Sequence, residues 1–505
     1  MDSNKQIKLG VFMSYLSIGI NILVGLLFTP WMISSIGREE YGLFTLANSV
    51  IMFFMFDFGL SSAITRFLSK YLAEGRKDKV NNCLGLVYKL YMSADIIFVL
   101  ALSSFYFFIP NVYKELTPDE IEKFKVIYAI AGIYSVLSFP FIPANGVLTA
   151  HERFAQIKIC DVIHKLVLVV VMTGCLAFGG GLYSLVLVNA LSGGITIVMK
   201  MWCISHYTDC KINFSYFERR EFRGILSFAG WTMLVALSQR LVTTIAPSIL
   251  GVYAGSASIA ILGIAMAIEG YTYTFSNAIA GMFLPKVSRV VSSNNGDVLP
   301  LMTKVGRFQI IIVGIITLAA ICLGKDFIYL WVGDGFDDSY YCAVLMVLPT
   351  FFFAPEEIAV QTVLARNKVK KQAIILIICS VLNIVLASIL SKYFGSIGMA
   401  ASICIVYLIR GIWQNISLYY KDLSIDLVKF LNDSFLSMSP ALIATLVVGL
   451  LMNYILTEHQ FRSFLLKSFI LFFVYSITML MRMNKFEKNT LLGPVKKIIT
   501  KTISK

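Results

Sequence analysis

The residues best able to do chemistry in this chain are charged side chains inside long apolar stretches. Arg410 lies near the middle of one stretch, and Arg240 and Glu269 lie near the middles of two others. A charge within bilayer hydrocarbon is costly unless it faces protein or water. Arg410 has no partner close by in the sequence, so we expect it to face a cavity or a ligand. Arg240 and Glu269 should lie at similar depth, either as a structural salt bridge or as a ligand-binding arginine with a protonatable partner.

Three more arginines, Arg66, Arg153 and Arg366, stand where apolar stretches give way to basic segments. The planar guanidinium group suits phosphate oxygens, so these residues are candidates for a cationic foothold at the inner mouth of a cavity. The alternative is that each one only anchors its helix at the membrane surface through a snorkelling side chain.

Carboxylates inside the apolar stretches could couple the movement of a solute to H⁺ or Na⁺, because they can alternate between charged and neutralised forms. Pro355 precedes two of them and should free backbone carbonyls, as in the broken helices of transporters. The alternative is a simple kink whose acids face an aqueous vestibule. The candidate coupling acids are Asp57, Asp95, Glu269, Glu356 and Glu357.

Other motifs add little chemistry. His164 and Lys165 lie close to Asp161 in the sequence and favour a locally neutralised cluster over a proton relay. The histidines form no HExxH pattern and the cysteines no CxxC spacing, so no metal or other cofactor is expected. A GxxxxGK[ST] loop is also missing, which excludes transport driven by ATP bound to this chain.

The composition supports a framework of membrane-spanning helices around these charges. Of 505 residues, 58% are hydrophobic and only 14% are charged, which is typical of a multipass membrane protein. The net charge of +14 would suit nucleic acid. However, the basic residues fall in short loops between apolar spans, where the positive-inside tendency explains them, and nucleic-acid binding is excluded on that ground.

Apolar stretches bounded by charges predict an all-α membrane protein with about fourteen transmembrane helices. With both termini in the cytoplasm, the inner segments hold about 30 of the 43 basic residues, and an odd number of spans would lose this asymmetry. The predicted spans are 11–33, 41–64, 84–109, 126–149, 157–178, 182–204, 225–250, 257–282, 308–325, 341–365, 373–391, 396–418, 435–456 and 463–481.

A weak internal repeat suggests how the spans are grouped. A proline, a glycine and an arginine occur at comparable places around the first two spans and around the seventh and eighth. This favours two pseudo-repeated six-helix bundles plus two C-terminal helices, with a cargo site between the bundles. The predicted domains are an N-terminal bundle (1–204), a cytoplasmic linker (205–223), a second bundle (224–420), two additional helices (421–481) and a basic cytoplasmic tail (482–505).

Two segments mix aromatic or aliphatic residues with cations. The linker from Ser205 to Gly224 alternates phenylalanine and tyrosine with arginine, and the tail from Leu491 to Lys505 alternates isoleucine and valine with lysine. Such patterns suit helices lying on an anionic inner leaflet.

Three features together resemble a known family. The segment 37–43 (GREEYGL) leads into Asp57-Phe58-Gly59-Leu60 and Arg66, which is similar to the opening of O-antigen and capsule repeat-unit flippases. The spans between Ala229 and Ser288 and the fourteen-span count with a cytoplasmic tail add to the likeness. The chain thus resembles the polysaccharide biosynthesis and export branch of the superfamily that also contains multidrug and toxin extrusion proteins and lipid II flippases.

The resemblance implies a flippase of the bacterial cytoplasmic membrane. Two bundles would form a V open to one side at a time, and the cargo would be undecaprenyl-pyrophosphate carrying one oligosaccharide unit. A polysaccharide polymerase and chain-length machinery are the implied protein partners. No enzymatic activity is expected, because moving such a lipid needs a cationic foothold, a polar cavity and an opening to lipid, but no nucleophile.

Alternatives remain open. Many relatives carry an acid in the seventh span where this chain has Gln239-Arg240, so a coupling role is not transferred to that position. A cation-coupled multidrug exporter would need a mostly acidic, aromatic cavity, and a lipid II flippase a set of cavity arginines that is not evident here. A membrane-embedded glycosyltransferase would need a large outer loop or a metal-binding acid motif.

Overall fold

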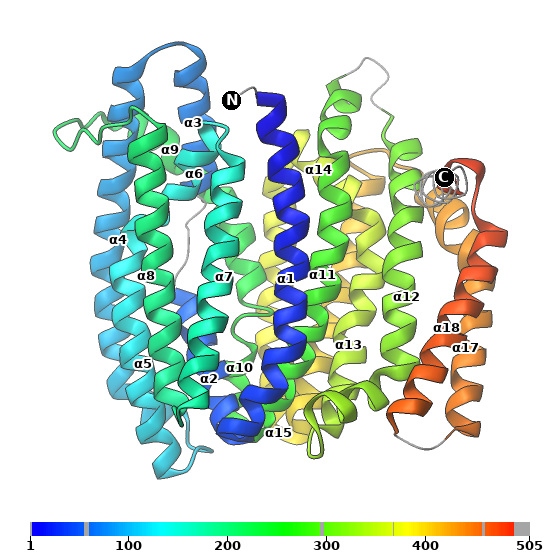
Figure 1. Ribbon diagram of the computed structural model, residues 1–505. Coiled ribbons are helices and arrows are strands. Elements are labelled where there is room, and N and C mark those ends of the chain that lie inside the picture. The colour runs from blue at the N-terminus through cyan, green and yellow to red at the C-terminus, as the bar shows by residue number, and fades with distance from the viewer. Residues whose placement is uncertain (1–2, 55–59, 293–296, 367, 457–459, 489–505) are drawn as a thin grey trace, which may run out of the picture. The chain divides into compact units, whose positions relative to one another are not determined.

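Helices form every regular element of the chain that the structure describes. The computed structural model describes residues 3–54, 60–292, 297–366, 368–456 and 460–488, and these ranges hold no β-strand (Figure 1). Apolar segments away from water must pair their own backbone N–H and C=O groups, which a helix does within one segment. The predicted all-α class is confirmed for this part of the chain.

The chain divides into two units by the packing within each. Unit 1 comprises Met1–Ile264 and Val369–Val406, and unit 2 comprises Ala265–Lys368 and Tyr407–Lys505. The predicted domain boundaries follow the order of the spans along the chain and stay a prediction.

Two helices contribute to both units, and the others belong to one. The shared helices are α11 (Gly255–Ser292) and α15 (Val369–Gln414). Unit 1 also holds α1 (Ser3–Ile36), α2 (Arg38–Phe54), α3 (Leu60–Ala73), α4 (Lys77–Val112), α5 (Pro118–Ser138), η1 (Phe139–Phe141), α6 (Ala144–Ala150), α7 (Phe154–Ala177), α8 (Leu182–Tyr207), α9 (Arg219–Arg240) and α10 (Ala246–Tyr253). Unit 2 also holds α12 (Leu299–Val332), α13 (Asp337–Phe353), η2 (Ala354–Glu356), α14 (Glu357–Ala365), η3 (Asn415–Tyr420), α16 (Leu427–Leu431), η4 (Asn432–Leu436), α17 (Ser437–Ile455) and α18 (Phe461–Arg482).

Eleven helical segments of the described chain are long and apolar enough to cross a membrane. One of them, Val369–Tyr420, is 52 residues long and is interrupted at Gly395, whose φ is 54°, so it covers two predicted spans. The predicted spans 41–64 and 225–250 fall instead on shorter helices, α2 with α3 and α9 with α10. The protein is therefore a multipass membrane protein, while the count of about fourteen spans and the side of each terminus stay predictions.

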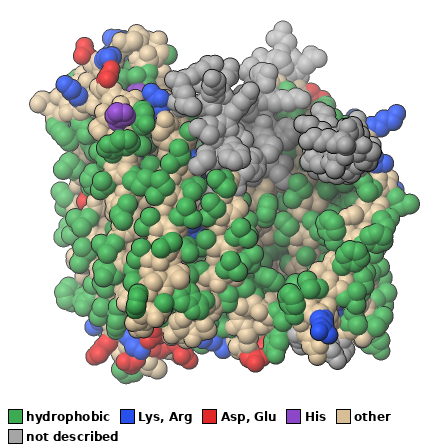
Figure 2. All heavy atoms as spheres, viewed as in Figure 1, with side chains coloured by type: hydrophobic (Ala, Val, Ile, Leu, Met, Phe, Trp, Pro, Cys, Tyr) green, Lys and Arg blue, Asp and Glu red, His purple; other side chains and the backbone are tan. Residues whose placement is uncertain are grey.

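Loops predicted to share one side of the membrane share one end of unit 1. Figure 1 shows the turns after α3, α6 and α8 at the end where α1 begins, and the turns after α1, α4 and α7 at the opposite end. Figure 2 shows hydrophobic side chains along the middle of these helices and charged side chains gathered toward their ends. Helices with apolar middles and charged ends are what consecutive crossings of a bilayer require.

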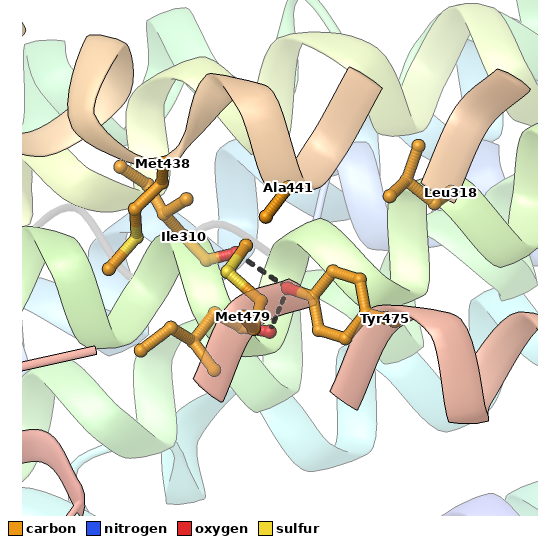
Figure 3. Close-up of a cluster of buried hydrophobic side chains, with 7 residues drawn as sticks. Ile310, Leu318, Met438, Ala441, Tyr475 and Met479 are labelled. Carbon is orange, nitrogen blue, oxygen red and sulfur yellow. Dashed lines mark hydrogen bonds between the residues drawn. The ribbon is translucent and has the colours of Figure 1, made fainter. Parts of the chain in front are cut away.

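In unit 2, the C-terminal hairpin of α17 and α18 packs on α12. Met438 and Ala441 of α17 and Met479 of α18 are buried against Ile310 of α12 (Figure 3). The hydroxyl of Tyr475 donates to the carbonyl of Ile311 at 2.6 Å, which satisfies its polar end within the apolar cluster.

Buried ion pairs fasten the same hairpin at both ends of α12. Lys467 of α18 donates to Asp326 at 2.7 Å, with 2% and 5% of the two side chains exposed. Arg307 donates to both carboxylate oxygens of Glu487, at 2.5 and 3.1 Å, just beyond α18. Because a buried ion is costly to leave unpaired, these pairs fix the position of the hairpin on α12.

The segment 208–218 between α8 and α9 has no helix, so the predicted surface helix is wrong for these residues. The N–H of Asn213 donates to the carbonyl of Asn81 on α4 at 3.2 Å, and its side-chain amide donates to Asn82 at 2.7 Å. The Asn213 carbonyl oxygen approaches Gly85 so closely that a Cβ there would lie 1.9 Å from it. These bonds hold the segment against α4, and we call residues 208–218 the strap. The tail 491–505 lies outside the described residues.

Candidate functional site

Arg410 is the centre of a polar cluster in unit 2. Its guanidinium carbon lies 4.4 Å from the ring centroid of Tyr407 and 5.1 Å from that of Phe353, so two aromatic faces hold the cation. Gly411 allows this packing, because a Cβ there would lie 2.0 Å from the Phe353 ring. Arg410 forms no ion pair within the part of the chain that the structure describes.

Two of the predicted acids lie beside Arg410 where a helix is broken. The helix that begins at Asp337 gives way to a 3₁₀ turn at η2 and resumes as α14, as Pro355 predicts. Glu356 is 7% exposed and accepts a hydrogen bond from the amide of Asn415 at 2.8 Å, and Glu357 accepts one from Gln361 at 2.8 Å. Both carboxylates lie within the electrostatic reach of Arg410.

A third acid, Glu269 of α11, belongs to the same cluster. Its carboxylate accepts a hydrogen bond from Thr350 of α13 at 3.4 Å and interacts electrostatically with Tyr407. Unit 2 therefore brings together Arg410, Glu269, Glu356 and Glu357, which the sequence places far apart.

The cluster holds polar atoms that the described chain does not satisfy. Nε of Arg410, Nε2 of Gln414 and Oδ1 of Asn415 are buried without a hydrogen-bond partner among the described residues. Arg410 and Gln414 lie in the last turns of α15, and Asn415 is the first residue of the π-helix η3 that follows. Buried polar groups are nearly always paired, and π-helical turns recur at functional sites. The arrangement can bind an anion or a hydroxyl-rich group in addition to its own side chains.

The remaining predicted arginines are engaged elsewhere. In unit 1, Arg240 at the end of α9 donates to the carbonyl of Met52 on α2. Arg153 stacks over the ring of Tyr207, with 5.2 Å from its guanidinium carbon to the ring centroid. In unit 2, Arg366 donates to the carbonyl of Leu423 at 3.3 Å. These contacts with backbone and ring fit anchoring, and the pairing of Arg240 with Glu269 stays a prediction.

Three other predicted residues belong to unit 1 or lie outside the described chain. Arg66 is exposed on α3. Asp95 is half-buried in α4 with Oδ1 unpaired among the described residues. Asp57 lies outside the described residues.

Sequence reasoning missed the true arrangement around Asp161 in unit 1. Its carboxylate pairs with Lys200 of α8 at 3.0 Å and with Lys158 at 3.6 Å, while His164 bonds to Thr196 at 2.7 Å. The predicted neutralising cluster with His164 and Lys165 is therefore wrong. Lys165 is left half-buried in α7 without a hydrogen bond or ion pair within the described chain. It is a second cation with spare binding capacity.

The aromatic support of Arg410 was also missed, although a signal existed. Tyr407, Arg410 and Gln414 recur at the spacing of one helix face, so they could have been grouped before the structure was seen. Phe353 and Thr350 come from another helix, and no local pattern points to them.

The helical fold with buried charges in its membrane segments defines the class, a multipass membrane protein. The family model for polysaccharide biosynthesis protein matches residues 7–291, more than half of the chain. The chain belongs to the polysaccharide biosynthesis protein family, which confirms the predicted membership. Comparison with curated proteins gives no match.

Solved structures share the fold at low sequence identity. A lipid II flippase MurJ in an inward closed conformation superposes with a TM-score of 0.68 and 15% identity, covering 94% of this chain and 97% of that one. An inward-facing multidrug resistance MATE family transporter of the MOP superfamily gives 0.60 and 14%, covering 82% and 98%. A MOP superfamily transporter from Pyrococcus furiosus gives 0.58 and 14%, covering 83% and 97%. This chain therefore has a MOP-type transporter fold.

Proposed function

We propose that this protein is a flippase that moves undecaprenyl-pyrophosphate-linked oligosaccharide repeat units across the bacterial cytoplasmic membrane by alternating access. The observation that carries the proposal is the buried cluster around Arg410, with its unpaired donor atoms on Arg410 and Gln414. Membership of the polysaccharide biosynthesis protein family supports a glycan cargo such as an O-antigen or capsule unit.

The chemistry of the cargo matches the cluster. A pyrophosphate is a dense anion that a guanidinium can bind through two parallel hydrogen bonds, and burial strengthens that attraction. Tyr407 and Phe353 hold Arg410 in place, so little side-chain freedom is lost when an anion binds. The free Nε2 of Gln414 can donate to a phosphate or sugar oxygen, and the free Oδ1 of Asn415 can accept from a sugar hydroxyl.

Glu269, Glu356 and Glu357 are the acids we assign to coupling. They share the cluster with Arg410, so H⁺ or Na⁺ on a carboxylate would change the charge that the anion meets. A polysaccharide polymerase and chain-length machinery are the expected downstream partners, since a flipped unit must be polymerised to be used.

A cation-coupled multidrug exporter is the second candidate, and one feature of the same cluster favours it. Three carboxylates accompany a single arginine there, and aromatic rings line it, which also suits an organic cation. The two functions need opposite treatment of Arg410: an exporter of cations should tolerate its loss, whereas a flippase of anions should not.

The test deletes the gene in its host and measures lipid-linked repeat units on the inner leaflet together with surface polysaccharide. We expect accumulated undecaprenyl-pyrophosphate oligosaccharide and lost surface glycan, restored by the wild-type gene and by Arg462→Ala, an exposed arginine outside the cluster. Arg410→Ala should fail to restore either. Normal glycan with altered sensitivity to cationic drugs would refute the flippase and favour the exporter.

A further inference from the structure

A pocket of about 450 Å³ lies at the start of α9 in unit 1. Its lining residues are Phe217, Arg219, Phe222, Arg223 and Leu226. The last four recur at the spacing of one face of α9, so the helix itself presents two cations beside two apolar side chains.

The acids of this region are turned to other partners. Glu221 lies 3.7 Å from the ammonium of Lys79 on α4 and accepts a hydrogen bond from the Tyr216 hydroxyl at 3.0 Å. Asp209 on the strap pairs with Lys77 at 2.8 Å, and that ammonium holds the pKa of the Asp209 carboxyl below its usual value. Asp209 and Glu221 thus direct their negative charge toward α4, while Glu218 of the strap accepts a hydrogen bond from the Tyr216 hydroxyl.

The pocket arginines have no such partners. Neither Arg219 nor Arg223 forms a hydrogen bond or ion pair within the described residues. Because the nearest carboxylates are engaged with lysines and a tyrosine, the pocket keeps its positive charge and complements an anion.

Apolar walls show that the anion should carry hydrocarbon. Phe217 is 61% exposed and Leu226 49% exposed, although both are large hydrophobic residues. The ring of Phe217 packs on Phe222 with centroids 5.5 Å apart, and the ammonium of Lys89 lies 5.9 Å from the Phe217 centroid. Two packed aromatic rings beside two unpaired arginines suit the membrane boundary between lipid headgroups and acyl chains.

We propose that this pocket binds the phosphate of an anionic phospholipid, with Arg219 and Arg223 as ligands of the phosphate and Phe217, Phe222 and Leu226 packing on the first part of its acyl chains. On the predicted topology the lipid belongs to the cytoplasmic leaflet, whose negative charge attracts basic segments at the membrane surface. The site shares no residue with the cluster around Arg410, and its test does not depend on the identity of the cargo.

The test measures lipid binding to the purified full-length protein by native mass spectrometry, with phosphatidylglycerol titrated against zwitterionic phosphatidylcholine. We expect Arg219→Gln and Arg223→Gln each to weaken phosphatidylglycerol binding by roughly tenfold, since a hydrogen bond to a charged group is lost. Arg220→Gln is the matched control, because Arg220 is exposed next to the pocket but does not line it. Thermal unfolding midpoints check that the variants fold.

Other outcomes would overturn the proposal. Equal weakening by Arg220→Gln would reduce the effect to general surface charge. If phosphatidylcholine binds as tightly as phosphatidylglycerol, Arg219 and Arg223 do not select an anionic lipid. Displacement by inorganic phosphate at similar concentration would show a site for phosphate ion without a lipid, and preference for a polyprenyl pyrophosphate over phosphatidylglycerol would assign the pocket to the cargo. If Arg219→Lys with Arg223→Lys retains binding where the glutamine variants lose it, the phosphate contact is supported.

Discussion

Replacing Arg410 separates its two roles, since it both neutralises nearby carboxylates and offers a cation to a ligand. In Arg410→Ala the stacking on Tyr407 and Phe353 is lost, at about 2 kcal/mol for a desolvated cation–π arrangement. Glu356 and Glu357 also lose their nearest cationic charge. Removing one member of a buried charge group costs about 3–5 kcal/mol, so we expect a destabilisation in that range.

A second substitution should repair stability but not transport. In Arg410→Ala with Glu356→Gln, the amide oxygen can still accept from Asn415, while the more deeply buried of the two charges near Arg410 is gone. We therefore expect the double variant to lie only about 2 kcal/mol below wild type, the part due to lost stacking. Transport should stay absent in both variants, because neither offers the cation that the proposed function assigns to pyrophosphate binding. Arg410→Lys keeps the charge without the planar fork and should retain partial activity, reduced roughly tenfold.

The assay is translocation of a fluorescent lipid-linked oligosaccharide in proteoliposomes, normalised to folded protein by size-exclusion chromatography, with thermal unfolding recorded for each variant. Recovery of wild-type transport in the double variant would refute the reasoning, since Arg410 would then serve only to neutralise Glu356. Wild-type transport by folded Arg410→Ala would exclude Arg410 from the binding site altogether.

Three further predictions test the packing around the cluster, the strap and the hairpin. Gly411→Ala should push the Phe353 ring off Arg410 and destabilise the protein by about 1–3 kcal/mol. Transport should fall by more than the lowered unfolding temperature explains. Unchanged transport would contradict the role of Phe353 in holding Arg410. Gly85→Ala should displace the strap and speed amide hydrogen exchange at 208–218, measured by mass spectrometry. Unchanged exchange would show that contact with Gly85 does not hold the strap. Lys467→Met should lower the stability measured by thermal unfolding by about 3–5 kcal/mol, because it leaves Asp326 unpaired. The stability of Lys467→Met with Asp326→Leu should return close to that of wild type. An equal loss in both variants would mean that the pair acts through more than its charges.

Much of the fold could be predicted because each helix that crosses a bilayer needs a long stretch of apolar residues. Within the described residues most of each predicted span is helical, and the break at Pro355 lies where the proline removes a backbone donor. The strap could not be predicted, because its conformation is set by hydrogen bonds to Asn81 and Asn82 more than 100 residues away in the sequence, while its own residues have an amphipathic pattern.

The candidate site was predictable in its charges but not in its partners. Hydropathy identifies Arg410 and Glu356 as costly residues that need a reason to be buried, yet it gives no information on which helix faces them. The same limit explains Asp161: the sequence predicts a neutralising cluster with His164 and Lys165, whereas Lys200 of α8 reaches the carboxylate from the neighbouring helix.

The cluster's composition gives a physical route to the proposed coupling. Arg410 is close enough to Glu356 and Glu357 to interact with both, yet it forms a direct ion pair with neither within the described chain. An arginine locked in a close ion pair would have to break that pair before binding pyrophosphate, and a solitary arginine would bind the anion without any link to an ion gradient. With the carboxylates at intermediate range, neutralising them by H⁺ or Na⁺ strengthens the field that Arg410 presents to an anion, and restoring their charge weakens it. A carboxylate that gains or loses an ion on one side of the membrane could therefore load or release cargo without any direct contact with it.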